Sequence, residues 1–271
     1  MIRNGRRTVS LDVMPAEETT ARAHPREAQP TLLVFTLGAR AERQRRPLLP
    51  GRCGGAELEL RRRLLDAALE AGRAAGCRLV VSSPRALAPV ADATHQAQTG
   101  GRFGDRLEAA VDTATDGGAP LVVVGTDVPG LGAEHLRQAL AAVAADPEAV
   151  VLGPSPDGGF YLLATARPLP GLAGLTRWCR SDTLAGLTRS LERAGRRVVL
   201  LAPLTDLDRR RDLERWLARL PRRLSTAWRA VVRRLVDLLD RLLRPLLPPP
   251  APRPLRVPVP VRRPRGPPRR R

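Results

Sequence analysis

Several residue types that define whole classes of protein are scarce or absent in this sequence. It contains no lysine, so all 46 basic residues are arginine, and it has only three cysteines and three histidines. Cys53, Cys77 and Cys179 are odd in number and widely separated, which argues against a disulfide framework and against a zinc site. The histidines form no triad with a serine, so nucleophilic hydrolysis is not indicated.

Long hydrophobic runs are also missing. No apolar stretch reaches the length of a membrane span, and the first 30 residues lack the apolar core of a secretory signal. Unpaired cysteines suit a reducing compartment. We therefore expect a cytoplasmic protein, with peripheral attachment to the inner face of the membrane as the alternative.

The positive charge is large, but it is concentrated at one end of the chain. The formal net charge is +19, and residues 221–271 supply +13 of it, with 15 arginines against Asp237 and Asp240. The remaining residues include few aromatics that could stack on bases, and no helix-turn-helix, RNA-recognition or zinc-finger signature. We expect no specific nucleic-acid partner.

Short apolar runs alternate with helix-forming stretches through most of the chain. Residues 1–30 are polar and aperiodic, which indicates a disordered extension, and residues 37–55, rich in Gly, Arg and Pro, indicate a loop. The pattern predicts strands over 31–36, 78–82, 121–124, 150–152, 160–163 and 197–201. It predicts helices over 56–75, 105–115, 133–145, 181–194 and 211–220. This alternation indicates an α/β fold with right-handed crossovers.

Two of the predicted strands end close to an aspartate. The runs 121–124 and 150–152 are short and rich in valine, and they stop at turn residues, which is typical of interior strands of a parallel sheet. Asp127 follows the first run and Asp157 the second. We expect both at the carboxyl edge of the sheet, where open α/β sheets bind ligands.

An ordered series of motifs resembles a bacterial family of GT-A-fold transferases, the DUF2064 type. The family is described as glycosyltransferase-like, with some members assigned to arsenosugar biosynthesis, and it is distantly related to phospholactate guanylyltransferase. The resemblance covers residues 31–217 and implies a mixed, mostly parallel sheet with helices on both faces, in a domain over 31–220. The motifs are GTDVPGL at 125–131, LGP at 152–154, DGGFYL at 157–162, and DLD at 206–208 followed by Asp212-Leu213.

A metal site is predicted at Asp127. A carboxylate after an apolar strand and before a Pro-Gly turn can coordinate Mg²⁺ or Mn²⁺ bridging two phosphates; alternatively it caps the next helix or closes the turn. The resemblance favours the metal, because family members carry an acid here. Asp206 and Asp208 are expected to point to opposite faces of an extended segment, so we predict Asp208 alone as a second ligand. Asp212 is expected to support the first turn of helix 211–220.

The Asp157-Gly158-Gly159 sequence predicts either an acceptor-binding loop or a structural turn. Paired glycines allow close approach of a ligand, and Asp157 is then the candidate general base. Asp-Gly is also a common hairpin dipeptide. Trp178 is predicted either to stack on a sugar or base or to pack half-buried in the core.

Nucleotide phosphates are expected near the first loop and one helix start. Family members carry a Lys-x-Pro-x-x-Gly-x-x-Lys-Thr-Arg-Leu type of segment after the first strand, but residues 36–48 here have arginines and an altered spacing. We predict Gly38 and Arg40 in this loop as nucleotide-binding, since arginine can clamp a diphosphate. Gly104 and Arg106 at the start of a helix are the other candidates.

The C-terminal region has its own pattern. Residues 221–247 keep apolar residues at helical spacing with arginines between them, which predicts a basic amphipathic helix. Such a helix either lies on an anionic membrane surface or packs on the protein body or a partner. Residues 248–271 form a Pro/Arg tract that predicts a disordered tail.

Three functions follow from these observations. The first is metal-assisted transfer of a sugar from a nucleotide-diphosphate donor to an acceptor. The second is nucleotidyl transfer, which uses similar acids but releases pyrophosphate. The third is a non-catalytic member that acts through its basic helix as a membrane-binding or partner-binding module.

Overall fold

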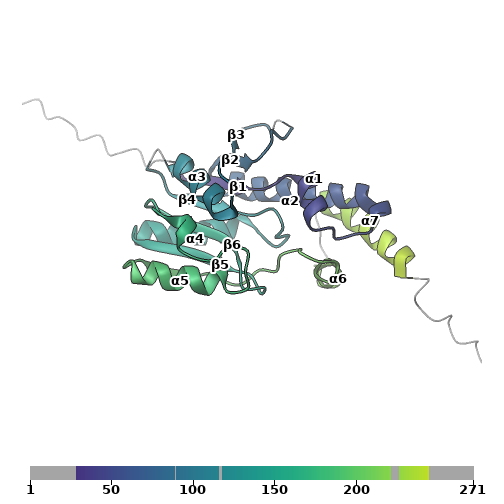
Figure 1. The fold of residues 1–271 in the computed structure, drawn as a ribbon. Coiled ribbons are helices and arrows are strands. Elements are labelled where there is room, and N and C mark those ends of the chain that lie inside the picture. The colour runs from purple at the N-terminus through teal and green to yellow at the C-terminus, as the bar shows by residue number, and fades with distance from the viewer. Residues whose placement is uncertain (1–28, 89, 116–117, 221–225, 244–271) are drawn as a thin grey trace, which may run out of the picture.

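The computed structural model describes residues 29–88, 90–115, 118–220 and 226–243, which form a central sheet with helices packed around it (Figure 1). The extension predicted over residues 1–30 and the tail predicted over 248–271 lie almost entirely outside the described residues. No helix in the described ranges is long and apolar enough to cross a membrane.

A seven-stranded mixed sheet forms the centre, in the order β3-β2-β1-β4-β6-β5-β7. The strands are β1 (Thr31–Phe35), β2 (Arg78–Ser83), β3 (Ala93–Ala97), β4 (Leu121–Val124), β5 (Ala149–Pro154), β6 (Phe160–Thr165) and β7 (Arg197–Leu200). All neighbours are parallel except β6, which runs antiparallel to both β4 and β5. The predicted mixed, mostly parallel sheet is therefore confirmed, and its antiparallel strand arises because the turn at 157–159 folds β6 back on β5 as a hairpin.

Both faces of the sheet are covered by helices, as expected for this fold class. The helices are α1 (Ala39–Arg45), α2 (Gly54–Ala74), α3 (Phe103–Thr115), α4 (Ala133–Ala145), α5 (Thr183–Arg193), α6 (Arg210–Ala218) and α7 (Thr226–Leu243). Alternate residues of β1 serve opposite faces: Leu32 and Val34 pack with α2 and α4, whereas Leu33 packs with α3 and α5. Burial on both faces explains why the central strands are continuous apolar runs.

Two elements differ from the sequence-based prediction. α1 and the short 3-10 helix Gly51–Cys53 lie in the stretch predicted as a loop. α1 has no buried residues, so it lacks the apolar stripe by which helices are recognised in a sequence. β3 was missed because this edge strand is largely exposed and has the polar sequence ATHQA.

A third apolar cluster lies beside the sheet and includes α7. Val231 and Leu235 of α7 are buried against residues of α2 and α6, and α7 runs alongside α2 (Figure 1). Trp228 packs edge-on against Trp216 at 5.3 Å between ring centroids, and Arg234 pairs with Glu59 at 2.6 Å. The apolar face of the C-terminal helix is therefore used on the protein body, and this placement favours body packing over a membrane contact.

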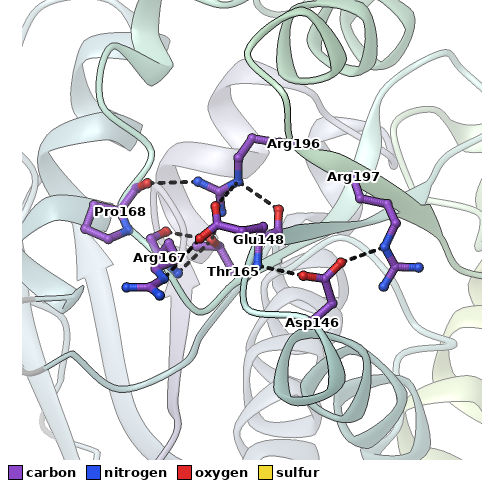
Figure 2. A network of polar contacts seen from close by, with 7 residues as sticks. All are labelled: Asp146, Glu148, Thr165, Arg167, Pro168, Arg196 and Arg197. Atoms are coloured by element: carbon purple, nitrogen blue, oxygen red, sulfur yellow. Dashed lines mark hydrogen bonds and ion pairs between the residues drawn. The ribbon is translucent and has the colours of Figure 1, made fainter.

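At the edge of the sheet where β5 and β7 begin, acids and arginines form a paired network (Figure 2). Arg197 donates to Asp146 at 2.7 Å, and Arg196 donates to the main-chain oxygen of Glu148 at 2.8 Å. The Glu148 carboxylate also lies 3.3 Å from Arg167. These contacts tie the starts of β5 and β7 to the end of β6.

Candidate active site

Three aspartates meet at the opposite edge of the sheet. Asp127 follows β4, whereas Asp206 and Asp208 belong to the segment between β7 and α6; one carboxylate oxygen from each lies within 4.8 Å of the others. The Leu207 N–H donates to the Asp127 main-chain oxygen at 2.8 Å, which fastens this segment beside the β4 loop. Leu207 itself is buried in the third apolar cluster.

The expectation that only Asp208 could join Asp127 was wrong. Positions two apart in an extended segment share a face, so Asp206 and Asp208 both turn toward Asp127 while Leu207 points into the protein. Asp212 lies outside this group. Its carboxylate accepts the Arg209 N–H at 2.9 Å at the start of α6, as predicted.

Burial and, after it, the neighbouring acids raise the pKa of two members of the cluster. Burial, followed by the nearby Asp208 and Glu42 carboxylates, raises the pKa of Asp127 to about 6. Burial, followed by Asp157, Asp127 and Asp208, raises the pKa of Asp206 to about 7. Like charges in a partly buried site repel one another, and a bound cation relieves that repulsion. Three carboxylates are also the hard oxygen ligands that Mg²⁺ and Mn²⁺ prefer, so the residues fit such an ion.

Arg46 is the cation placed closest to these acids in the described structure. Its guanidinium forms an ion pair with Asp208. Burial lowers the pKa of Arg46, but the hydrogen-bonded Asp208 and the charge of Asp127 outweigh burial and hold the pKa above its ordinary value. Arg46 was not predicted from the sequence as a site residue. The group of arginines at 43, 45 and 46 was the feature of the sequence that pointed to it.

Two cavities meet at the acid cluster. The smaller, of about 180 Å³, is lined by Phe35, Thr36, Phe103, Arg106 and Thr126, among others. The larger, of about 490 Å³, is lined by Asp157, Trp178, Arg180, Asp206 and Arg209, among others. Both include Arg46 and Asp127 in their walls, so a ligand that spans the two must pass these side chains.

Of the residues predicted to bind nucleotide, Arg106 lines the smaller cavity, whereas Gly38 and Arg40 are not among the described residues of its wall. Arg106 lines it and donates to the Gly101 oxygen at 2.9 Å. Gly38 precedes α1 with φ +85°, and its N–H donates to the Thr36 hydroxyl at 3.0 Å. Arg40 is exposed on α1 and is not among the described residues that line either cavity. Arg45 and Arg46, one turn further on, line the smaller cavity instead.

Gly104 has a packing role in the structure. A Cβ at this position would come within 2.5 Å of the Trp178 Nε1 atom, so the glycine admits the indole. The indole N–H donates to the Ala173 oxygen at 2.8 Å, and the ring packs near Phe103 and Phe160, with centroids 5.6 and 6.1 Å away. Trp178 is thus half-buried and also forms part of the wall of the larger cavity.

The Asp157-Gly158-Gly159 turn borders the larger cavity. Asp157 is exposed and accepts the Gly159 N–H at 2.9 Å, and both residues line the cavity. Gly158 has φ +89°, and a Cβ there would lie 1.8 Å from the Ser181 oxygen. The second glycine therefore faces the cavity, whereas the first allows the turn to pack on the segment before α5.

The comparisons with known proteins agree with this architecture. Residues 63–179 match the family DUF2064, described as "Uncharacterized protein conserved in bacteria". A crystal structure from Desulfovibrio desulfuricans G20, provisionally named a nucleotide-diphospho-sugar transferase, is 22% identical with a TM-score of 0.65, over 78% of this chain and 97% of the other. The comparison with curated proteins finds no match.

Two further structures are of Rv0371c from Mycobacterium tuberculosis H37Rv. One is 21% identical over 71% of this chain and 99% of the other, with a TM-score of 0.49. The second, a complex with manganese, is 21% identical over 71% and 100% of the two chains, with a TM-score of 0.47. Residues 63–179 thus match the DUF2064 family model, and the chain as a whole shares the fold of the Desulfovibrio desulfuricans structure.

Proposed function

We propose that this protein is a metal-assisted transferase that takes a nucleotide-diphosphate donor, with sugar transfer as the reaction. The observation that carries the proposal is the position of Asp127, Asp206 and Asp208, within 4.8 Å of one another where two cavities meet. One cavity suits the donor and the other the acceptor, and the reacting bond then lies between them. The proposed unit is wider than residues 31–220, because α7 completes the apolar cluster behind the acids.

Each group has a defined task in this reaction. The three aspartates would hold Mg²⁺ or Mn²⁺, which when bound neutralises charge that develops on the leaving diphosphate. Arg46 lies beside Asp208 and reaches both cavities, so it can bind the diphosphate at the same point. Arg106, in the wall of the smaller cavity, is placed for a second phosphate contact.

Asp157 is the proposed general base. It faces the larger cavity on the acceptor side, on a turn braced by its own contact with Gly159. Its carboxylate accepts the proton of an acceptor hydroxyl while the acceptor oxygen bonds to the sugar carbon. The bond from that carbon to the donor oxygen breaks, and the nucleoside diphosphate leaves with the electron pair.

Nucleotidyl transfer is the second candidate, and the number of acids favours it. Three carboxylates exceed what one ion on a diphosphate requires, and enzymes that displace pyrophosphate commonly use two ions. The attack would then fall on the α-phosphorus of a nucleoside triphosphate. The two reactions differ in product: nucleoside diphosphate for the first and pyrophosphate for the second.

The test is thermal stabilisation of the full chain by nucleoside diphosphates, triphosphates and nucleotide sugars, with and without Mn²⁺. We expect nucleotides of one base to raise the melting temperature only when Mn²⁺ is present, and we expect this rise to be lost in Asp127→Ala. Asp146→Ala, at the other edge of the sheet, is the matched control and should keep the shift. No shift with any nucleotide, from a protein that melts cooperatively, would rule out the proposal.

A further inference from the structure

Glu57 on α2 is a completely buried carboxylate with a full set of partners. Its relative exposure is 0%, and Arg61, one turn along the helix, is 6% exposed. The Arg61 Nε–H donates to Glu57 Oε1 at 3.0 Å. Two main-chain amides also donate to Glu57: Leu48 donates to Oε1 at 3.1 Å, and Leu49 donates to Oε2 at 3.0 Å. The Arg43 Nε atom lies farther away, 3.8 Å from Oε2.

Arg61 holds the same stretch of chain from its other end. Its Nη2 group donates to the main-chain oxygen of Arg46 at 2.5 Å. The stretch from Arg46 to Leu49 follows α1 and belongs to no helix or strand, so its polar main-chain groups need other partners. The buried pair on α2 thus fastens this stretch at three points.

Arg46 is the residue whose side chain leaves this stretch toward the acids. It pairs with Asp208 and lines both cavities, whereas Leu48 and Leu49 point into the third apolar cluster. The main chain is therefore held on one side while the guanidinium is presented on the other. An apolar pair of similar volume would fill the same space without fastening the amides, so burial alone does not require these charges.

We propose that Glu57 and Arg61 are positioning residues that set the place of the Arg46 guanidinium over the acid cluster. The role rests on the proposed function, because Arg46 matters there as the diphosphate contact and as the competitor of a metal ion for Asp208. Loss of the pair leaves the acids in place and lets Arg46 move away from them.

The test compares Glu57→Gln, Arg46→Ala and the double variant in the full chain, with Mn²⁺ as the probe. Arg46→Ala should raise the affinity for Mn²⁺ about fivefold, because a cation no longer competes for Asp208. Glu57→Gln should also raise the affinity for Mn²⁺, and the double variant should bind Mn²⁺ no more tightly than Arg46→Ala does. General destabilisation would lower metal affinity, and Leu191→Ala, buried on the other face of the sheet, is the control for it.

Two measurements need no metal and separate this proposal from the proposed function. Amide exchange at Leu48 and Leu49 and the NMR relaxation of the Arg46 Nε–H group should both show increased mobility in Glu57→Gln. If wild type binds no Mn²⁺, the metal-assisted function is overturned while these two measurements still decide the positioning role. The positioning role would be overturned if amide exchange and relaxation were unchanged in Glu57→Gln. It would also be overturned if Glu57→Gln raised the affinity for Mn²⁺ in a protein that already carries Arg46→Ala. If Glu57→Gln does not fold, Glu57→Gln/Arg61→Met removes both buried charges and takes its place.

Discussion

The two edges of the sheet use the same residue types in opposite ways. Where β5 and β7 begin, Asp146 and Glu148 each face arginines (Figure 2), and the hydrogen bond from Arg197 is the largest effect that lowers the pKa of Asp146. At the other edge, Asp127, Asp206 and Asp208 crowd together, Arg46 pairs with Asp208, and the pKa of Asp127 rises to about 6. Paired charges hold strands together, whereas clustered like charges store repulsion that a ligand can relieve.

The largest expected effect separates the two edges by function. Asp127→Ala should lower the affinity for metal-dependent nucleotide by more than about 100-fold, since even outer partners of metal ligands are worth about 10- to 100-fold. Asp146→Ala should leave the affinity within about twofold. Titration calorimetry with Mn²⁺ and the nucleotide found by thermal stabilisation measures both. Equal losses in the two variants would show that the clustered acids have no special role.

The next effect concerns the apolar cluster behind the acid edge. Leu235 of α7 is completely buried, and Leu235→Ala should lower the free energy of unfolding by about 2 to 4 kcal/mol. Val236, its neighbour, is 39% exposed, so Val236→Ala should cost less than about 0.5 kcal/mol. Urea unfolding of both variants gives the two values. A similar small cost for both would mean that α7 is not packed on α2 and α6.

Turns at the two edges should also respond differently. Gly158→Ala places a Cβ 1.8 Å from the Ser181 oxygen at φ +89°, so the turn must move, at a cost of about 2 to 3 kcal/mol. Gly76, before β2 at the paired edge, has φ +76° but no atom within 4 Å of an added Cβ, and its alanine variant should cost about 1 kcal/mol. Thermal unfolding distinguishes them. The space around each turn, rather than the backbone angle, is responsible for the difference.

The final comparison is a pH dependence of opposite sign at the two edges. The pKa values of Asp127 and Asp206 are raised above their unfolded values, so these two groups do not destabilise the fold below about pH 4 and destabilise it increasingly as the pH rises toward 6 to 7. The pKa of Asp146 is lowered, so its contribution is present at neutral pH and is lost in acid. Metal-free Asp127→Asn should lack about 2 kcal/mol of the loss between pH 4 and 7. An unchanged pH profile in that variant would contradict the raised pKa.

Much of the fold could be predicted from the local pattern of apolar residues in the sequence. The predicted helix over 133–145 coincides with α4, and the predicted strand over 121–124 coincides with β4. The apolar residues of α4 form one stripe only if the segment is helical, and the continuous apolar run of β4 is typical of a strand buried on both faces. β3 and α1 lack such a pattern, which is why they were missed.

The candidate site could be predicted only in part, because some of its residues are brought together by contacts between distant segments. Asp127 and Asp157 could be located because strand ends are visible in the sequence and point to one edge of the sheet. Arg46 could not be preferred over Arg40, since its role depends on a contact with Asp208, 162 residues away. The prediction that Asp206 faces away from Asp127 was wrong, because residues two apart in an extended segment share a face and the Leu207 N–H bond to the Asp127 main-chain oxygen turns that face toward Asp127.

Local hydrophobic periodicity and turn chemistry were enough to specify the fold class, most helices and strands, and the edge of the sheet at which the candidate site lies. Tertiary packing alone decided the insertion of β6 between β4 and β5, the burial of the apolar face of α7, and the meeting of three aspartates with Arg46. The reason is physical: a residue's own neighbours set its backbone preference, whereas charge repulsion, burial and hydrogen-bond partners depend on segments brought together only by the folded chain.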